Sequence, residues 1–292
     1  MKTIEPQIQS RSRSLFTAAT VAALMGFTAT ATQAATIGHW NFEAESLTDA
    51  DAGPNNLKLT TLGSGVTRVE SPFPDPIPRT GAANEWAASF GGSGNLETTE
   101  TAASKLGVQS FTIEAFIRAD VDANSNMYIS SRWKSSGRSW ALGRAGATST
   151  TGGTSRGLFL LVSGNGTETH ILGSGLVLNQ GDQYYVGASF NGTSETDDVT
   201  FYLQNLTDGG SLQSVTISSG RISTNNPATG PIQIGSFSDQ SSRWTGLIDE
   251  VRLSSEVLSE NQLLIIPEPG TYAALAGLMA LGLAAVRRRR RA

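Results

Sequence analysis

Carboxylates are the most abundant side chains in this sequence that could do chemistry, because it has no cysteine and only two histidines. These counts exclude disulfides and a cysteine nucleophile, and they argue against a zinc site. Cleavage of a glycosidic bond needs two carboxylates beside that bond. Glu43 and Glu45 form one pair, but Glu45 falls in a predicted loop. Asp249 and Glu250 are adjacent, so we expect them to face opposite sides of a strand. No catalytic residues are predicted.

A serine-nucleophile pattern, Gly-x-Ser-x-Gly, occurs at residues 153–157. That pattern requires a helix after the serine, whereas a strand is expected here. Only one histidine, His170, follows it, fifteen residues after Ser155. We interpret the match as chance in a Gly/Ser-rich loop.

Tryptophans form the second group, since exposed aromatic rings can stack on sugars. Trp133, with Lys134 beside it, and Trp140 flank a polar turn and are the predicted glycan contacts. Trp86 and Trp244 are further candidates. The alternative is that these rings belong to the core, because a tryptophan in a strand is usually buried or half-buried.

The elements that must position these residues are strands. In residues 111–118, Phe111, Ile113, Ala115 and Ile117 alternate with other side chains, which is the period of a β-strand. The same pattern recurs in 184–190 and 199–204. Further strands are predicted at 36–42, 86–90, 127–132, 139–143, 157–162, 214–217, 232–235 and 244–253. Turn signals such as Asn-Gly separate them, and only 254–264 suggests a helix. The sequence therefore predicts an all-β sandwich or jelly roll.

Charge is distributed unevenly along the 292 residues. Without the two ends, the chain keeps 13 basic and 23 acidic residues, a balance of −10. An acidic surface repels phosphate backbones, so no nucleic-acid partner is predicted.

The N-terminus, residues 1–34, has the features of a secretory signal peptide. Lys2, Arg11 and Arg13 precede a short apolar run, and small residues follow near Ala34. The run is shorter than the ~20 residues of a membrane span, although an uncleaved anchor is the alternative.

The C-terminus, residues 267–292, has three parts. Pro267-Glu268-Pro269 is followed by an uncharged, Ala- and Leu-rich stretch and then by the arginines Arg287, Arg288, Arg289, Arg290 and Arg291. This order resembles the PEP-CTERM sorting signal. The resemblance implies a transmembrane helix, recognition by an exosortase after export, and association with exopolysaccharide in Gram-negative-type bacteria. A plain single-span anchor is the alternative.

Residues 35–266 resemble the laminin-G-like, concanavalin-A-like jelly roll. The resemblance rests on the segments 39–43, 51–56, 110–117, 129–142 and 244–253 in this order. It implies the fold far more strongly than any function. The catalytic Glu-x-Asp-x-x-Glu motif of laminarinase-like enzymes with a related sandwich is absent.

Jelly rolls of this kind often carry Ca²⁺, which takes six to eight oxygen ligands. The first and last strands can be neighbours in this fold, so Glu43 and Asp249 could converge. Asp49, Asp51 and Asn55 from the first loop could add oxygens. These five residues are the predicted calcium ligands. The alternative is that Asp249 caps a turn or pairs with an arginine, and that the loop acids are solvated.

Together these features predict an exported, non-catalytic protein of the cell surface or extracellular matrix that binds or organises exopolysaccharide. Its other expected partners are the export machinery, an exosortase and, transiently, the inner membrane. Adhesion through protein contacts and a carbohydrate-active enzyme are the alternatives.

Overall fold

The computed structural model describes residues 36–267, apart from 135–136, 195, 197, 221–224, 227–228 and 239–241. The predicted signal peptide lies outside the described residues. So does the sorting tail from Glu268 onward, and of the sorting motif only Pro267 is described. No helix within the described part is long and apolar enough to cross a membrane.

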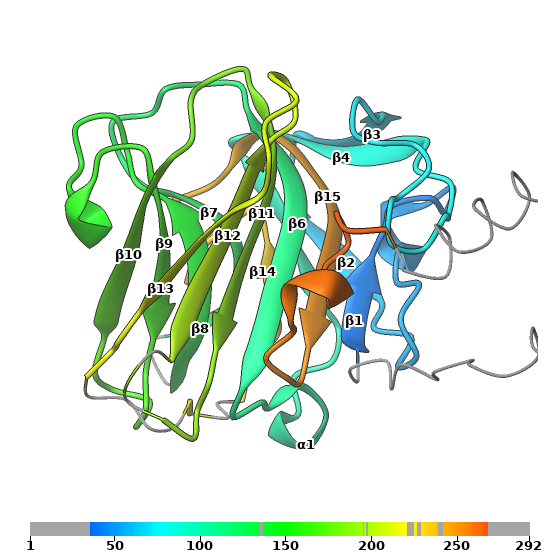
Figure 1. Cartoon of the computed structure of the whole chain (residues 1–292). Helices are drawn as coiled ribbons and strands as arrows, with labels where there is room; N and C mark the ends of the chain where they lie inside the picture. The colour runs from blue at the N-terminus through cyan, green and yellow to red at the C-terminus, as the bar shows by residue number, and fades with distance from the viewer. Residues whose placement is uncertain are drawn as a thin grey trace, which may run out of the picture. The chain divides into compact units, whose positions relative to one another are not determined.

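The described chain is a sandwich of two antiparallel sheets, and the all-β prediction is confirmed (Figure 1). Sheet A has the order β13-β12-β11-β6-β15-β4-β3, with β1 also paired to β15. Sheet B has the order β10-β9-β8-β7-β14-β5-β2. The strands of sheet A are β1 (Thr36–Trp40), β3 (Val66–Glu70), β4 (Trp86–Gly91), β6 (Phe111–Ala119), β11 (Gln183–Phe190), β12 (Val199–Asn205), β13 (Gln213–Ile217) and β15 (Thr245–Ser254). Those of sheet B are β2 (Leu59–Gly63), β5 (Gly94–Thr98), β7 (Met127–Lys134), β8 (Gly137–Arg144), β9 (Gly157–Val162), β10 (His170–Val177) and β14 (Gln233–Ile234).

Alternation along the strands separates a core between the sheets from the outer faces. In β6, Ile113, Ala115 and Ile117 belong to the main core, whereas Phe116 belongs to a different apolar cluster. Successive strand residues point to opposite faces, so Phe116 lies on the outer face of sheet A. That cluster also contains Phe73 and Ile77 from a loop and Leu258, Leu263, Leu264 and Ile265 from the segment after β15.

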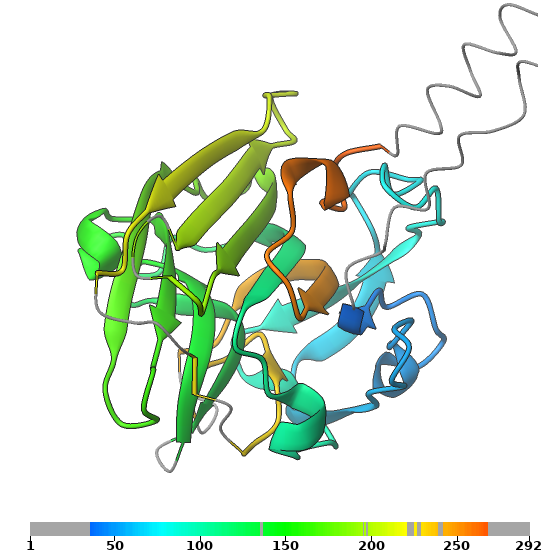
Figure 2. The same cartoon turned by 60° about the horizontal axis from the view of Figure 1, so that its bottom comes forward.

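The segment after β15, residues 255–266, covers the outer face of sheet A. It runs in orange across the strands of this sheet in Figures 1 and 2. The helix predicted over 254–264 is wrong: the described part holds one 3₁₀ turn there, η3 (Glu260–Gln262). The chain stays extended because Leu258, Leu263 and Leu264 must all reach the sheet, and each is at most 2% exposed.

The other helical elements described are short: η1 (Leu47–Asp49), α1 (Ala103–Leu106) and η2 (Thr151–Gly153). Strands β2, β3, β5 and β10 were not predicted. Of these, β2, β3 and β10 lie at sheet edges, where one side of the strand is open. Their side chains are largely half-exposed, so the alternation that marks a strand is weak.

Candidate functional site

Strand β15 positions most of the polar residues of the candidate site. One of its edges pairs with β6, and the other is shared by β4 and β1. The register with β6 shifts between Asp249 and Arg252, where Glu250 has a φ of +51°. This β-bulge inserts one extra residue, which re-aims the side chains around it.

The bulge corrects the expectation that Asp249 and Glu250 face opposite sides. Asp249 aligns with Phe116 of the outer face. Glu250 contacts Nε2 of His39, and His39 aligns with Arg252, whose guanidinium pairs with Glu114. Both carboxylates therefore lie on the outer face of sheet A.

The carboxylates of Glu43, Asp249 and Glu250 lie close enough for the charges of Glu43 and Glu250 to raise the pKa of Asp249. Asp249 is fully buried and accepts hydrogen bonds from the Ser71 hydroxyl at 2.9 Å and from the Glu250 N–H at 2.8 Å. Its burial, and then the charges of Glu250 and Glu43, hold its pKa well above the usual value. Burial also raises the pKa of Glu43, which accepts a hydrogen bond from the Trp86 N–H at 3.0 Å.

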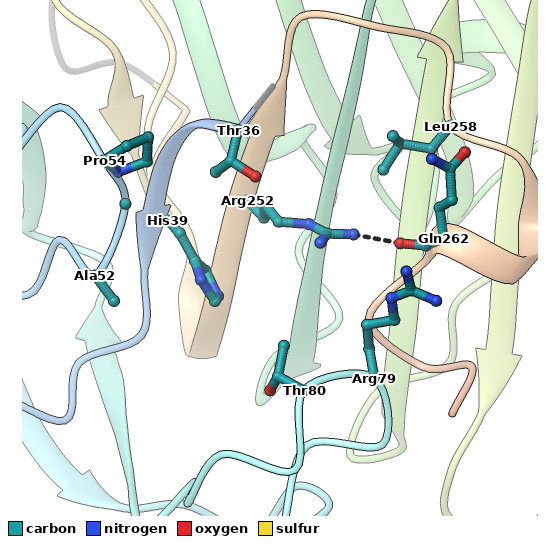
Figure 3. A pocket seen from close by; sticks show the side chains of 10 residues that line it. Thr36, His39, Ala52, Pro54, Arg79, Thr80, Arg252, Leu258 and Gln262 are labelled. Atoms are coloured by element: carbon teal, nitrogen blue, oxygen red, sulfur yellow. Dashed lines mark hydrogen bonds between the residues drawn. The ribbon is translucent and has the colours of Figure 1, made fainter. Parts of the chain in front are cut away.

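A pocket of about 510 Å³ opens beside this carboxylate group (Figure 3). It lies between β1, the loop after it, the loop around Thr80 and the segment after β15. Its lining residues are Thr36, His39, Ala52, Gly53, Pro54, Arg79, Thr80, Arg252, Leu258 and Gln262. None of these described lining residues is an Asp or Glu.

A buried hydrogen-bond network supports the pocket from beneath. Glu114, fully buried, accepts from Arg252 Nε at 2.7 Å and from Arg252 Nη2. It also accepts from the Tyr185 hydroxyl at 2.6 Å and from the Leu264 N–H at 2.9 Å. Arg252 Nη2 further donates to the Gln262 carbonyl at 2.8 Å. These bonds join strands β15 and β6 to the covering segment at the pocket.

The predicted glycan contacts do not form a platform. Trp140 is fully buried in the core with its ring 5.6 Å from that of Phe111, so it offers no face to a sugar and that prediction is wrong. Trp133 is 5% exposed and packs 5.6 Å from Phe237 on the outer face of sheet B. Lys134 ends β7 and is half-buried.

The rings of the two further tryptophan candidates are not exposed to a ligand either. Trp244 is fully buried, and the half-buried Trp86 lies under the Arg68 guanidinium at 3.9 Å.

The predicted calcium ligands are divided between two places. Glu43 and Asp249 lie near each other, as expected, but the loop residues bond to strand β1 and to neighbouring loop residues. Asp49 pairs with Lys58 at 3.0 Å, and Asn55 donates to the Ile37 carbonyl at 2.7 Å. Asp51 accepts from the N–H groups of His39 at 3.0 Å, Gly53 at 2.7 Å and Leu57. Among the described residues, no group of three or more His, Asp or Glu could hold a metal ion. Calcium binding stays a prediction.

Sequence reasoning missed the residues that form the pocket. Alternation with the buried Trp40 could have placed His39 on the outer face of β1. Nothing in the sequence showed that Arg79, in a proline-rich loop, donates to the Asn261 carbonyl of the covering segment, because that contact depends on the fold.

The comparisons with known proteins concern the same domain. A laminin-G-type family model, described as the concanavalin A-like lectin/glucanases superfamily, matches residues 90–264. A comparison of the sequence with curated proteins finds no match.

Among solved structures, domain 4 of AbnA, a GH43 extracellular arabinanase from Geobacillus stearothermophilus, in complex with arabinotriose, is 12% identical. The match covers 80% of this chain and 98% of that one, with a TM-score of 0.52. The binding domain of botulinum neurotoxin serotype D/C is also 12% identical, and the match covers 79% of this chain and 51% of that one, with a TM-score of 0.51. At these identities the likenesses show the fold alone.

Proposed function

Because the chain belongs to the concanavalin A-like lectin/glucanases superfamily, we propose that it is a non-catalytic carbohydrate-binding protein that holds a saccharide in the pocket beside β1. The observation that carries this proposal is the pocket itself. It offers side-chain hydroxyl, amide, imidazole and guanidinium groups to sugar oxygens. Pro54 and Leu258 supply apolar surface, and a few fixed polar groups beside apolar surface are typical of ligand sites.

A binding role fits the pocket better than hydrolysis. A glycosidase needs two carboxylates flanking the bond that it cleaves. The bulge does bring Asp249 and Glu250 to one face, but they are 0% and 1% exposed and neither lines the pocket. The described residues that line the pocket can donate hydrogen bonds, but none of them has a carboxyl group that could protonate a leaving group.

The proposed location is the cell surface or the extracellular matrix, where the protein would organise exopolysaccharide. The support is the sequence alone: the signal-like residues 1–34 and the sorting-signal-like residues 267–292. We expect the exported protein to begin after Ala34 and to lose its tail only in cells with an exosortase. Mass spectrometry of both ends in cells with and without that enzyme tests this location.

Thermal unfolding of the purified protein with a panel of neutral and acidic polysaccharides tests the binding role. A ligand that binds the folded state raises the midpoint, by an amount that grows with its concentration. We expect at least one polysaccharide to raise it, and Thr80→Val, which removes one pocket hydroxyl, to reduce the rise. If no polysaccharide shifts the midpoint, the binding role is wrong.

A further inference from the structure

We infer that the pocket selects an acidic saccharide, whose carboxylate or sulfate group binds between Arg252 and Gln262. This inference rests on the proposed function, since it names the class of ligand for the same site. It comes from the hydrogen-bonding groups that remain available after the contacts within the protein are satisfied.

Arg252 keeps one end of its guanidinium for a ligand. Its Nε and Nη2 are occupied by Glu114 and by the Gln262 carbonyl. Nη1 makes no hydrogen bond among the described residues, although Arg252 lines the pocket. Figure 3 shows its side chain reaching from β15 toward Gln262, with Arg79 next to it. Two N–H groups of a fixed cation are thus available to a ligand.

Gln262 also has a hydrogen-bond donor, its side-chain NH₂ group, that is available to a ligand. Its Oε1 accepts the backbone N–H of Ser259 at 3.0 Å, which caps the turn η3. An N–H must face an oxygen, so this bond fixes the orientation of the amide. The NH₂ group then makes no hydrogen bond among the described residues and belongs to a residue that lines the pocket.

The remaining lining groups do not reverse this excess of donors. The Arg79 guanidinium has no acceptor atom and donates to the Asn261 carbonyl, and the hydroxyls of Thr36 and Thr80 can donate or accept. His39 has Nε2 engaged by Glu250, which leaves Nδ1 to accept when the ring is neutral and to donate when it is charged. A ligand group rich in acceptor oxygens complements this set, and carboxylates and sulfate esters are such groups.

General electrostatic attraction does not explain such binding. The chain between the two ends has a balance of −10, and Glu114 balances the charge of Arg252. Binding of an acidic sugar therefore depends on directed hydrogen bonds in the pocket. A polyanion would be repelled by the rest of this protein, and Glu250, which contacts His39 beside the pocket, adds to the repulsion.

The test uses the variant Gln262→Glu, because Arg252 also holds the covering segment and its replacement could unfold the protein. Glutamate keeps an oxygen to accept the Ser259 N–H, since a capping turn uses Glu or Gln equally. The change removes the NH₂ donor and places a carboxylate against the ligand. The matched control is Gln213→Glu, the same change at an exposed residue of β13.

The ligands are an oligogalacturonate, the same oligosaccharide with its carboxylates reduced to alcohols, and a sulfated oligosaccharide, titrated calorimetrically against the full exported protein. We expect an acidic ligand to bind at least about tenfold more tightly than the reduced one. Loss of one hydrogen bond to a charged group should weaken that binding by about tenfold or more in Gln262→Glu. Gln213→Glu should bind as the unaltered protein does.

The outcomes separate this inference from the proposed function. Binding of the uronate or of the sulfated ligand alone would support it and identify the acidic group. Equal binding of the reduced and acidic ligands would overturn the selection for acid while leaving the carbohydrate-binding role intact. Acid-selective binding that Gln262→Glu does not weaken would place the site elsewhere. Binding of no saccharide would overturn both.

Discussion

The outer faces of the two sheets are both covered, but by different means. On sheet A, charged residues such as Glu114 and Arg252 are buried together under the segment after β15. On sheet B, the aromatic rings of Tyr128, Trp133, Phe159 and Phe237 pack on one another at 4.2 to 5.6 Å. Removing one partner of a buried ion pair leaves a buried charge unpaired, whereas removing one ring of an aromatic cluster removes only packing. The pocket lies on the face that carries the buried ion pair.

The largest effect on stability is expected from Glu114→Ala. It leaves Arg252 without its counter-ion and the Tyr185 hydroxyl and Leu264 N–H without an acceptor, so the free energy of unfolding should fall by about 3–5 kcal/mol. Urea unfolding measures the loss. The control on sheet B is Glu97→Ala, where a half-buried carboxylate accepts a hydrogen bond from the Gln233 side chain at 3.2 Å. Equal losses in both variants would contradict the comparison.

A smaller effect is expected from Phe237→Ala on sheet B. The ring stacks on Tyr128 at 4.2 Å but is half-buried, so its removal should lower the free energy of unfolding by about 2 kcal/mol. Saccharide affinity should stay unchanged, because the pocket belongs to sheet A. A loss of affinity in a folded variant would move the site to sheet B.

The effect of replacing Asp249 is expected to change with pH. Since the pKa of Asp249 is raised in the folded state, its contribution to stability is complete below the unfolded pKa of about 4. That contribution is lost as the pH rises toward the folded pKa. Asp249→Asn should therefore match the unaltered protein near pH 3 and exceed its stability near pH 7. Thermal midpoints across this range would show the crossing, and parallel curves would argue against a raised pKa.

The sequence predicted those strands in which apolar side chains alternate with other side chains along the chain. The alternation in 111–118 predicted β6, and the predicted strand 244–253 differs from β15 by one residue at each end. It was uninformative about the bulge, because one extra residue in a strand changes the pairing without changing the composition. The same limit applies to Trp140. Alternation assigns a side chain to one of the two faces of a strand, but it does not tell which face is buried in the core.

The pairing of β1 with β15 also has a kinetic consequence. His39 and Glu250 are 211 residues apart in sequence, and such distant contacts form late in folding. In the proposed export, which starts at the N-terminus, β1 emerges before β15 and has no partner strand until β15 follows. The pocket is then completed by the final pairing, after nearly all of the domain has emerged. Only a chain that has completed the pairing of β1 with β15 would then bind at the pocket. A chain truncated before β15 would be unable to bind.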